Sequence, residues 1–285
     1  MIKEDIMKKI ISVLLVILML CTALLTASCS DNRGNDKDNN DNSNKNDGQK
    51  TAKEVVEGSI DKFKDLDSYY AVMTQDISVS MQGVSMEMPV TVTIKVQDAK
   101  SQNPKIYAIQ EVTMLGETVS IEMYVENGYV YISSDGTNQK LELSQFGDAA
   151  DSVMYNKTVE ELLQVLPEDV MKDVSLLYNT NGTRYVEVEF DPTKFLQLYA
   201  SNIEGLSEDL GLFIDDLQIS DSKVKIVIDR NDYIKEYTLD YKMGITVQGQ
   251  DANASVTLKM EFYEPGKPVT VTPMEGYQNF PSVNQ

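Results

Sequence analysis

The sequence lacks histidine and tryptophan, and only two of its 285 residues are cysteines. The missing imidazole removes the commonest general base and the commonest transition-metal ligand of proteins. Catalytic systems that pair serine or cysteine with histidine are therefore excluded, and so are zinc sites that need histidine. No glycine-rich loop for phosphate is present either. We predict a protein that is not an enzyme and that uses no cofactor and no metal.

Basic residues are also scarce in this chain. Lys and Arg number 25 against 45 Asp and Glu, which gives a formal net charge of −20. Binding to nucleic acid relies on clustered Lys and Arg, so we expect no nucleic-acid partner. The acidic excess favours solubility at a crowded surface. Because so many carboxyl groups make some close pair inevitable, such a pair is no signal for glycoside hydrolysis.

The start of the chain has the pattern of an export signal. A basic pair at residues 8–9 precedes an almost unbroken apolar run over residues 10–25. Small residues follow and lead to Cys29, which is the arrangement at a signal-peptide cleavage site. Acidic residues are unusual so near the start of a signal, so translation starts at Met1 or at Met7. A transmembrane helix and an ordinary secretory signal are the alternatives for the apolar run.

The residues around Cys29 favour a lipoprotein. Residues 25–29 (Leu-Thr-Ala-Ser-Cys) resemble the lipobox of bacterial lipoproteins, although Thr26 stands where that motif usually has leucine. In that family the cysteine thiol carries diacylglycerol, and cleavage makes this cysteine the first residue. The resemblance implies that residues 1–28 are a signal peptide and that Cys29 is lipidated.

A polar segment follows this cysteine. Residues 30–50 are rich in Asn and Asp and contain no apolar side chain, so they cannot bury enough surface to fold. We expect residues 29–51 to be a flexible tether. Cys21 leaves with the signal, so the folded part has no disulfide and depends on its core. The protein is expected to be a monomer, held by lipid on the outer face of the cell membrane. A location of the Gram-positive type is favoured over a periplasmic one.

Beyond the tether the hydrophobic pattern becomes regular. Apolar side chains recur at helical spacing over residues 53–66, and the period then changes to two, as in strands with one apolar face. Asn127-Gly128 between two such segments predicts a tight hairpin. Six antiparallel strands are expected here, near residues 73–81, 90–97, 106–114, 119–126, 129–132 and 140–143.

The second half mixes helices with strands. Helices are expected over residues 158–165, 168–178 and 191–202, the last with Asp191 as N-cap and Pro192 in its first turn. Strands are expected over residues 185–190, 224–228, 233–241, 245–247 and 256–262. A proline-rich tail from residue 265 is expected to lie extended on the surface. Since no long linker interrupts residues 52–285, one α+β domain is the simplest account.

Two acidic groups contain the oxygen ligands that calcium prefers: Asp215-Asp216 and Asp229-Asn231-Asp232. Neither has the spacing of an EF-hand loop. Asp and Asn are also common in turns, because their side chains form hydrogen bonds to the turn backbone. We therefore interpret the second group as the turn of a hairpin.

The order of the elements resembles that of a known family. Residues 61–70 (DKFKDLDSYY) and 224–239 (VKIVIDRNDYIKEYTL) are similar to segments of the LolA-like lipoprotein superfamily, which includes the LppX/LprG group. The sequence looks closest to uncharacterised Gram-positive lipoproteins of that type. The resemblance implies an α+β fold in which a strongly curved antiparallel sheet, a half-barrel, has helices packed on its concave face. It also implies an apolar space that takes a lipid or an acyl chain.

If the resemblance extends to the ligand, the inward strand faces line that space and helices plug it. The expected ligand-binding residues are Met73, Ile77, Val79, Met81, Val92, Ile94, Ile121, Met123, Val256, Leu258 and Met260 on strands, and Leu162 and Phe195 on helices. Methionine suits an adaptable apolar site. The same residues would equally form an ordinary core, because any sheet needs an apolar face beneath its helices.

Two functions are therefore open. In the first, a lipid-anchored protein at the cell surface binds or shuttles a lipid or another hydrophobic ligand. In the second, a non-enzymatic envelope interaction protein contacts its partner through the acidic outer face of the sheet, and the inner face is only core.

The anchor is tested by replacing its cysteine. We expect Cys29→Ala to release the protein from the membrane fraction into the medium or periplasm, as measured by cell fractionation and immunoblotting. Cys21→Ala is the matched control and should leave the protein in the membrane, because Cys21 belongs to the expected signal peptide. Membrane association that survives Cys29→Ala would contradict the lipid anchor.

Overall fold

The computed structural model describes residues 50–101, 103–144, 171–179, 181–194, 214–247 and 250–282. The helices within these ranges are α2 (Ala52–Lys64) and the short 3-10 helix η2 (Tyr277–Asn279). The strands are β1 (Tyr69–Met81), β2 (Val84–Gln97), β3 (Lys105–Met114), β4 (Glu117–Glu126), β5 (Tyr129–Ser134), β6 (Thr137–Glu142), β7 (Met171–Tyr178), β8 (Arg184–Phe190), β9 (Ile214–Ile228), β10 (Ile234–Val247) and β11 (Gln250–Tyr263).

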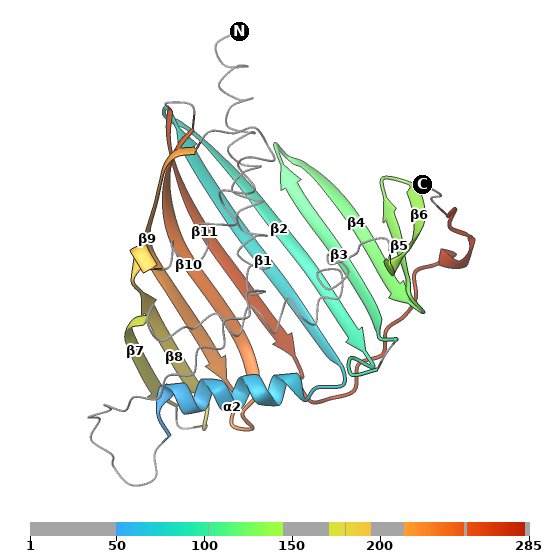
Figure 1. Cartoon of the computed structure of the whole chain (residues 1–285), viewed down its shortest axis with the longest axis horizontal. Coiled ribbons are helices and arrows are strands. Elements are labelled where there is room, and N and C mark those ends of the chain that lie inside the picture. Colours follow the sequence, from blue (N-terminus) through green and yellow to red (C-terminus); the bar gives the residue numbers. More distant parts are fainter. Residues whose placement is uncertain are drawn as a thin grey trace.

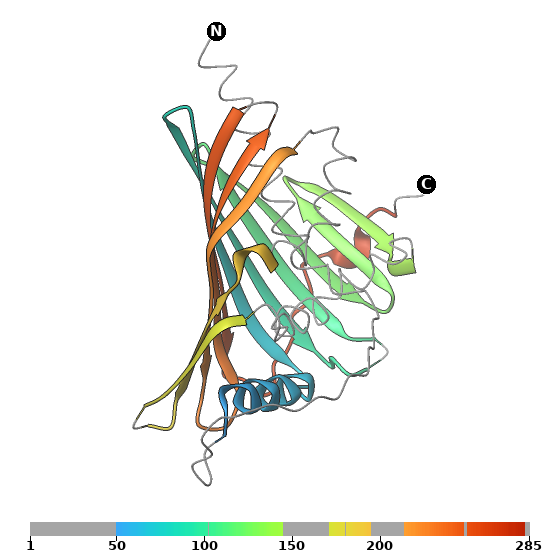
Figure 2. The same ribbon diagram turned by 60° about the vertical axis from the view of Figure 1, so that its left-hand side comes forward.

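The strands form one antiparallel sheet. Their order is β6-β5-β4-β3-β2-β1-β11-β10-β9-β8-β7, so β1 lies in the middle and pairs with β11 near the other end of the chain (Figure 1). The predicted meander of six strands is confirmed as β1 to β6. Figure 2 shows that the sheet is twisted and curved. Its edge strands β6 and β7 are not paired with each other, so the sheet is open.

Helix α2 confirms the helix predicted over residues 53–66. A capping box starts it: Thr51 Oγ1 accepts from the backbone N–H of Glu54, and Glu54 Oε2 accepts from the backbone N–H of Thr51. Its buried stripe includes Ile60 and Phe63, and the Phe63 ring lies 5.1 Å from the ring of Phe262 on β11. Figure 1 shows α2 lying across the lower end of the sheet.

Other helix predictions have a mixed outcome. The helix expected over residues 168–178 is wrong where the structure describes it, because Met171–Tyr178 is strand β7. A turn that contains Asn181-Gly182 joins β7 to β8, and this hairpin signal was overlooked. Asp191 caps a helical start as predicted, with its Oδ1 accepting from the backbone N–H groups of Thr193 and Lys194. The helix over residues 158–165 lies outside the described residues.

The prediction that helices pack on the concave face is therefore tested only for α2. Among the described residues α2 covers one end of the sheet, and none of the described helices is long and apolar enough to cross a membrane. Packing of further helices against this sheet stays a prediction.

The strands expected over residues 233–241 and 245–247 are one continuous strand, β10, which passes through Gly244 without a break.

The C-terminal tail packs on the sheet as predicted. Met274 is buried with Tyr124 of β4 and Tyr131 of β5. The Tyr277 ring stands edge-on to both tyrosines, at 5.0 and 4.8 Å between ring centroids. The Tyr277 hydroxyl donates to Glu126 Oε2 at 3.0 Å. Burial opposes ionisation of Glu126, but hydrogen bonds from a lysine and from Tyr277 outweigh it and lower the pKa of this carboxyl group.

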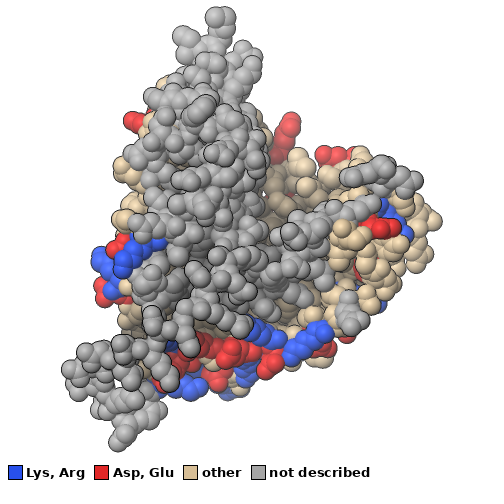
Figure 3. All heavy atoms as spheres, in the orientation of Figure 1, with Lys and Arg blue, Asp and Glu red and all other residues tan. Residues whose placement is uncertain are grey.

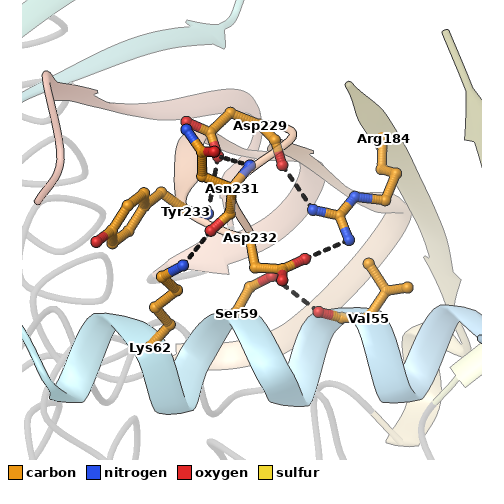
Figure 4. Close-up of polar contacts among 8 residues, drawn as sticks. All are labelled: Val55, Ser59, Lys62, Arg184, Asp229, Asn231, Asp232 and Tyr233. Atoms are coloured by element: carbon orange, nitrogen blue, oxygen red, sulfur yellow. Dashed lines mark hydrogen bonds and ion pairs between the residues drawn. The ribbon is translucent and has the colours of Figure 1, made fainter. Parts of the chain in front are cut away.

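A polar cluster fixes α2 to the end of the sheet, and we call it the polar clamp (Figure 4). It comprises Lys62, Arg184, Asp229, Asn231 and Asp232. Arg184 donates to the Asp229 carbonyl at 2.6 Å and forms an ion pair with Asp232 at 2.5 Å. Lys62 of α2 donates to the carbonyl of Asn231 in the turn between β9 and β10. The clamp thus joins α2 and this turn to β8.

The turn itself follows the predicted chemistry. Asp229 Oδ1 accepts from the backbone N–H groups of Asn231 and Tyr233, at 2.8 and 3.0 Å. The hairpin turn predicted over residues 229–232 is therefore confirmed. For Asp232, burial disfavours the charged form, but the hydrogen bond and charge of Arg184 outweigh it and lower the pKa below the ordinary 3.8.

This pKa shift makes the clamp sensitive to pH. Because the pKa of Asp232 is lower in the folded state, its carboxylate stabilises the fold above the unfolded pKa, and this contribution is lost as pH falls through the folded pKa. We expect Asp232→Asn to lower the free energy of unfolding at pH 7 by about 1 kcal/mol, less than for a fully buried pair. The difference from wild type should shrink below about pH 4. Urea unfolding at several pH values measures it.

Asp221→Asn is the matched control, since Asp221 pairs with Lys242 at 2.8 Å on an exposed part of the surface. It should change the stability little at any pH. An effect of Asp232→Asn that is equal at pH 7 and in acid would contradict the assignment of the stabilising charge to Asp232.

Candidate functional site: the inner face of the sheet

One face of the sheet is apolar over nearly its whole width. Along β1 every second residue from Tyr69 to Met81 is buried, and the residues between them are partly or fully exposed. The same alternation holds in β2, β8 and β11. We call the buried side the inner face and the opposite side the outer face. The view in Figure 1 is onto the inner face, with α2 in front of the strands.

Backbone pairing aligns the apolar residues in rows across the strands. One row runs from β8 to β4 through Val186, Ile226, Tyr237, Met260, Met73, Val92, Gln110 and Ile121. Because each step follows a hydrogen-bonded strand pair, side chains in a row are neighbours on one face. Gln110 is the polar residue of this row, so the apolar side chains run without interruption from β8 to β2 and resume at Ile121 on β4.

The predicted strand residues lie on this face. Nine of them are buried and adjacent on β1, β2 and β11: Met73, Ile77, Val79, Met81, Val92, Ile94, Val256, Leu258 and Met260. Ile121 and Met123 lie on the same face further along the sheet, on β4. Leu162 and Phe195 lie outside the described residues, and so does Cys29. The structure thus brings eleven predicted side chains onto one surface, and their role as ligand contacts stays a prediction.

Burial decreases where β3 turns into β4. On the inner face of these strands Val112 and Met114 are half-buried, whereas Val119 and Ile121 are 44% and 38% exposed. We call these four residues the rim. Apolar side chains that continue a buried face out to solvent are a common feature of binding surfaces. The rim is therefore an apolar part of the inner face that water reaches.

Sequence patterns missed two features of this face. Met86 and Met88 are buried there, but the strand was expected to begin only at residue 90, where the strict alternation starts. Pro89 is accommodated one residue beyond the β2–β3 ladder, which starts at Val90. The second omission is Gln75, which is buried at the apolar phase of β1. The sequence could have indicated it, because Gln75 is a polar residue at a position of β1 where the alternation requires an apolar one.

Charge is concentrated away from the inner face. In Figure 3 the acidic and basic side chains gather along the lower margin, over α2, and at the edges, while the visible part of the sheet is mostly uncharged. On the outer face Lys259 pairs with Glu236 and Glu261, at 3.2 and 3.1 Å. Among the described residues no three acidic side chains lie close enough to hold a metal ion.

The outer face is consequently less acidic than its composition suggested. Lys223 pairs with Glu187 across β9 and β8, and Lys242 pairs with Asp221 across β10 and β9. These lysines lie beside the carboxylates that were expected to give the outer face its negative charge. Local neutralisation weakens the long-range field that would attract a basic partner.

The fold and its apolar face define an open antiparallel sheet protein. The chain belongs to DUF6612, a family of unknown function whose sequence pattern matches residues 51–267. No relative was found among curated proteins.

Solved structures give only distant likenesses. LprF from Mycobacterium bovis is 14% identical with a TM-score of 0.39, over 78% of this chain and 96% of that chain. A DUF1329 family protein from Desulfovibrio piger is 9% identical with a TM-score of 0.26, over 75% of this chain and 94% of that chain. At these TM-scores we base no functional inference on the likeness.

Two truncations separate the core from the rim. Ile77 is only 1% exposed, so Ile77→Ala should lower the free energy of unfolding by about 2–5 kcal/mol. Ile121→Ala makes the same chemical change at the rim and should cost less than about 1 kcal/mol. Chemical denaturation of both variants measures the difference. Equal losses would show that Ile121 is packed as tightly as the core and would contradict an accessible rim.

Proposed function

We propose that this protein is a lipid-anchored surface protein that binds a lipid or another hydrophobic molecule on the inner face of its sheet. The observation that supports this proposal is the apolar row Val90, Val112 and Val119, which leads from the buried centre of the inner face to the exposed rim. A face that served only as core would gain nothing from apolar side chains in water at Val119 and Ile121. A molecule that enters at Val119 meets apolar contacts through Val112 to Val90.

The composition of the inner face suits an apolar ligand of variable shape. Six methionines are buried on it: Met73, Met81, Met86, Met88, Met243 and Met260. Their thioether side chains are flexible and polarizable, so they adapt to different acyl chains better than branched residues do. In this proposal the protein carries out no chemical reaction. Its apolar face gives affinity, and selectivity rests on the few polar groups that the face contains.

The expected lipid on Cys29 gives the proposal its setting. A flexible tether over residues 29–51 would keep the folded part close to the bilayer, where a lipid ligand is concentrated. The same tether would allow the rim to turn toward the membrane or away from it. We expect the protein to take up its ligand from that membrane.

The alternative is an interaction protein that uses its outer face. Ion pairs with lysines locally neutralise carboxylates on β8, β9, β10 and β11, which weakens the negative potential of the outer face on which that alternative depended. We therefore favour ligand binding. The interaction protein predicts a specific macromolecular partner and no bound lipid.

A charge at the rim tests the proposal. We expect Ile121→Asp to reduce the lipid that is retained after gentle purification by at least about tenfold, because a carboxylate in an apolar contact is costly. Lipid extraction followed by mass spectrometry measures the retained lipid per protein molecule. The protein is produced as residues 29–285 with Cys29→Ala, so that it carries no attached lipid. Every lipid that is detected is then non-covalently bound.

Ser255→Asp is the control. Ser255 is exposed on the outer face of β11, so a carboxylate there should leave lipid retention unchanged. Ligand binding on the inner face is contradicted if the parent chain retains no lipid, or if the two substitutions have equal effects.

A further inference from the structure

Gln75 occupies the centre of the inner face. It is the middle residue of β1, and β1 is the middle strand of the eleven. At about 3.3 Å per residue it lies roughly 20 Å from either end of its strand. Its side chain is only 3% exposed. This amide is therefore placed as far from the sheet margins as the fold allows.

Among the described residues, the strand neighbours of Gln75 on this face are all apolar. Met73 and Ile77 flank it along β1, and Val90 and Leu258 lie opposite it on β2 and β11. The diagonal neighbours are Met88, Val92, Val256 and Met260. All eight of these side chains are buried.

The amide nitrogen of Gln75 has no hydrogen-bond partner. Its Nε2 atom is buried and unpaired, although an amide NH2 group offers two donors. Buried polar groups are nearly always satisfied, because leaving one unpaired costs free energy. A trapped water needs two or more polar partners, and the eight neighbouring side chains supply none. The unpaired donor therefore requires another explanation.

We propose that Gln75 Nε2 donates a hydrogen bond to a carbonyl oxygen of the bound lipid. This inference rests on the proposed function and adds the chemical class of the ligand: an acyl ester or acyl amide, in which an apolar chain carries a carbonyl group. The apolar rows accommodate the chain. The amide at their centre fixes the position of the carbonyl along the face, since a misplaced carbonyl would leave both groups unpaired.

A pair of ligands and a pair of variants test this contact. The ligands are a monopalmitoyl glycerol ester and the monohexadecyl glycerol ether, which lacks the carbonyl but keeps the chain and the glycerol. Their affinities are measured by calorimetry on the mature chain, residues 29–285, with Cys29→Ala. Gln75→Met replaces the amide with a thioether of similar length. Gln278→Met makes the same change at an exposed position in η2, on the tail that packs against the outer face.

We expect the parent chain and Gln278→Met to bind the ester about tenfold more tightly than the ether, the ratio that corresponds to about 1.4 kcal/mol. Gln75→Met should lose this preference while still binding both ligands. The same variant should raise the midpoint of thermal unfolding of the ligand-free protein by about 2–4 °C, because it removes an unpaired buried amide. The thermal midpoint therefore shows whether the variant is folded. It distinguishes a loss of binding that is caused by misfolding from a loss of the carbonyl contact.

Each remaining outcome overturns a different statement. If the parent chain binds ester and ether equally, the carbonyl contact is wrong and the proposed function stands. If Gln75→Met keeps the preference for the ester, another group recognises the carbonyl. If the parent chain binds neither ligand, the proposed function fails, and the inference about Gln75 fails with it.

Discussion

The pairing of β1 with β11 is the interaction on which the rest of the structure depends. It joins the meander β1 to β6 to the later strands β7 to β11, and without it the chain would form two smaller sheets with exposed apolar edges. Its register places Met73 beside Met260 and Ile77 beside Val256. A slip of one residue would turn every inward side chain of one strand outward, so this register also fixes the continuity of the inner face.

Local structure could be predicted from the sequence because its signals are local. The alternation of Val90, Val92 and Ile94, the turn at Asn127-Gly128 and the Asp229 turn are each determined by neighbouring residues, and the structure confirms them. The same kind of signal at Asn181-Gly182 was overlooked, and the helical interpretation of residues 168–178 was wrong where the structure describes them, at Met171–Tyr178. The segment is short and its apolar spacing fits either period, so only its partner strand β8 decides between them.

Long-range features could not be predicted in this way. No pattern within β1 or β11 indicates that they pair, because their alternation would fit many partners. The isolation of Gln75 depends on Val90 and Leu258, which belong to two other strands. The polar clamp likewise joins Lys62, Arg184 and Asp232 from distant parts of the sequence. The sequence pattern was therefore sufficient to assign the predicted lining residues to one face of the sheet. The burial of Gln75 and the exposure of the rim depend on neighbouring strands and could be recognised only in the assembled sheet.

The central claim is that a ligand lies on the inner face, and the methionines report on it directly. Methyl-labelled methionine gives one NMR signal per residue. On addition of a monopalmitoyl glycerol ester, the account predicts shifts for Met73, Met88 and Met260 on the inner face and none for Met274, which is buried against the outer face. Shifts confined to Met274, or no shift at any methionine, would contradict it.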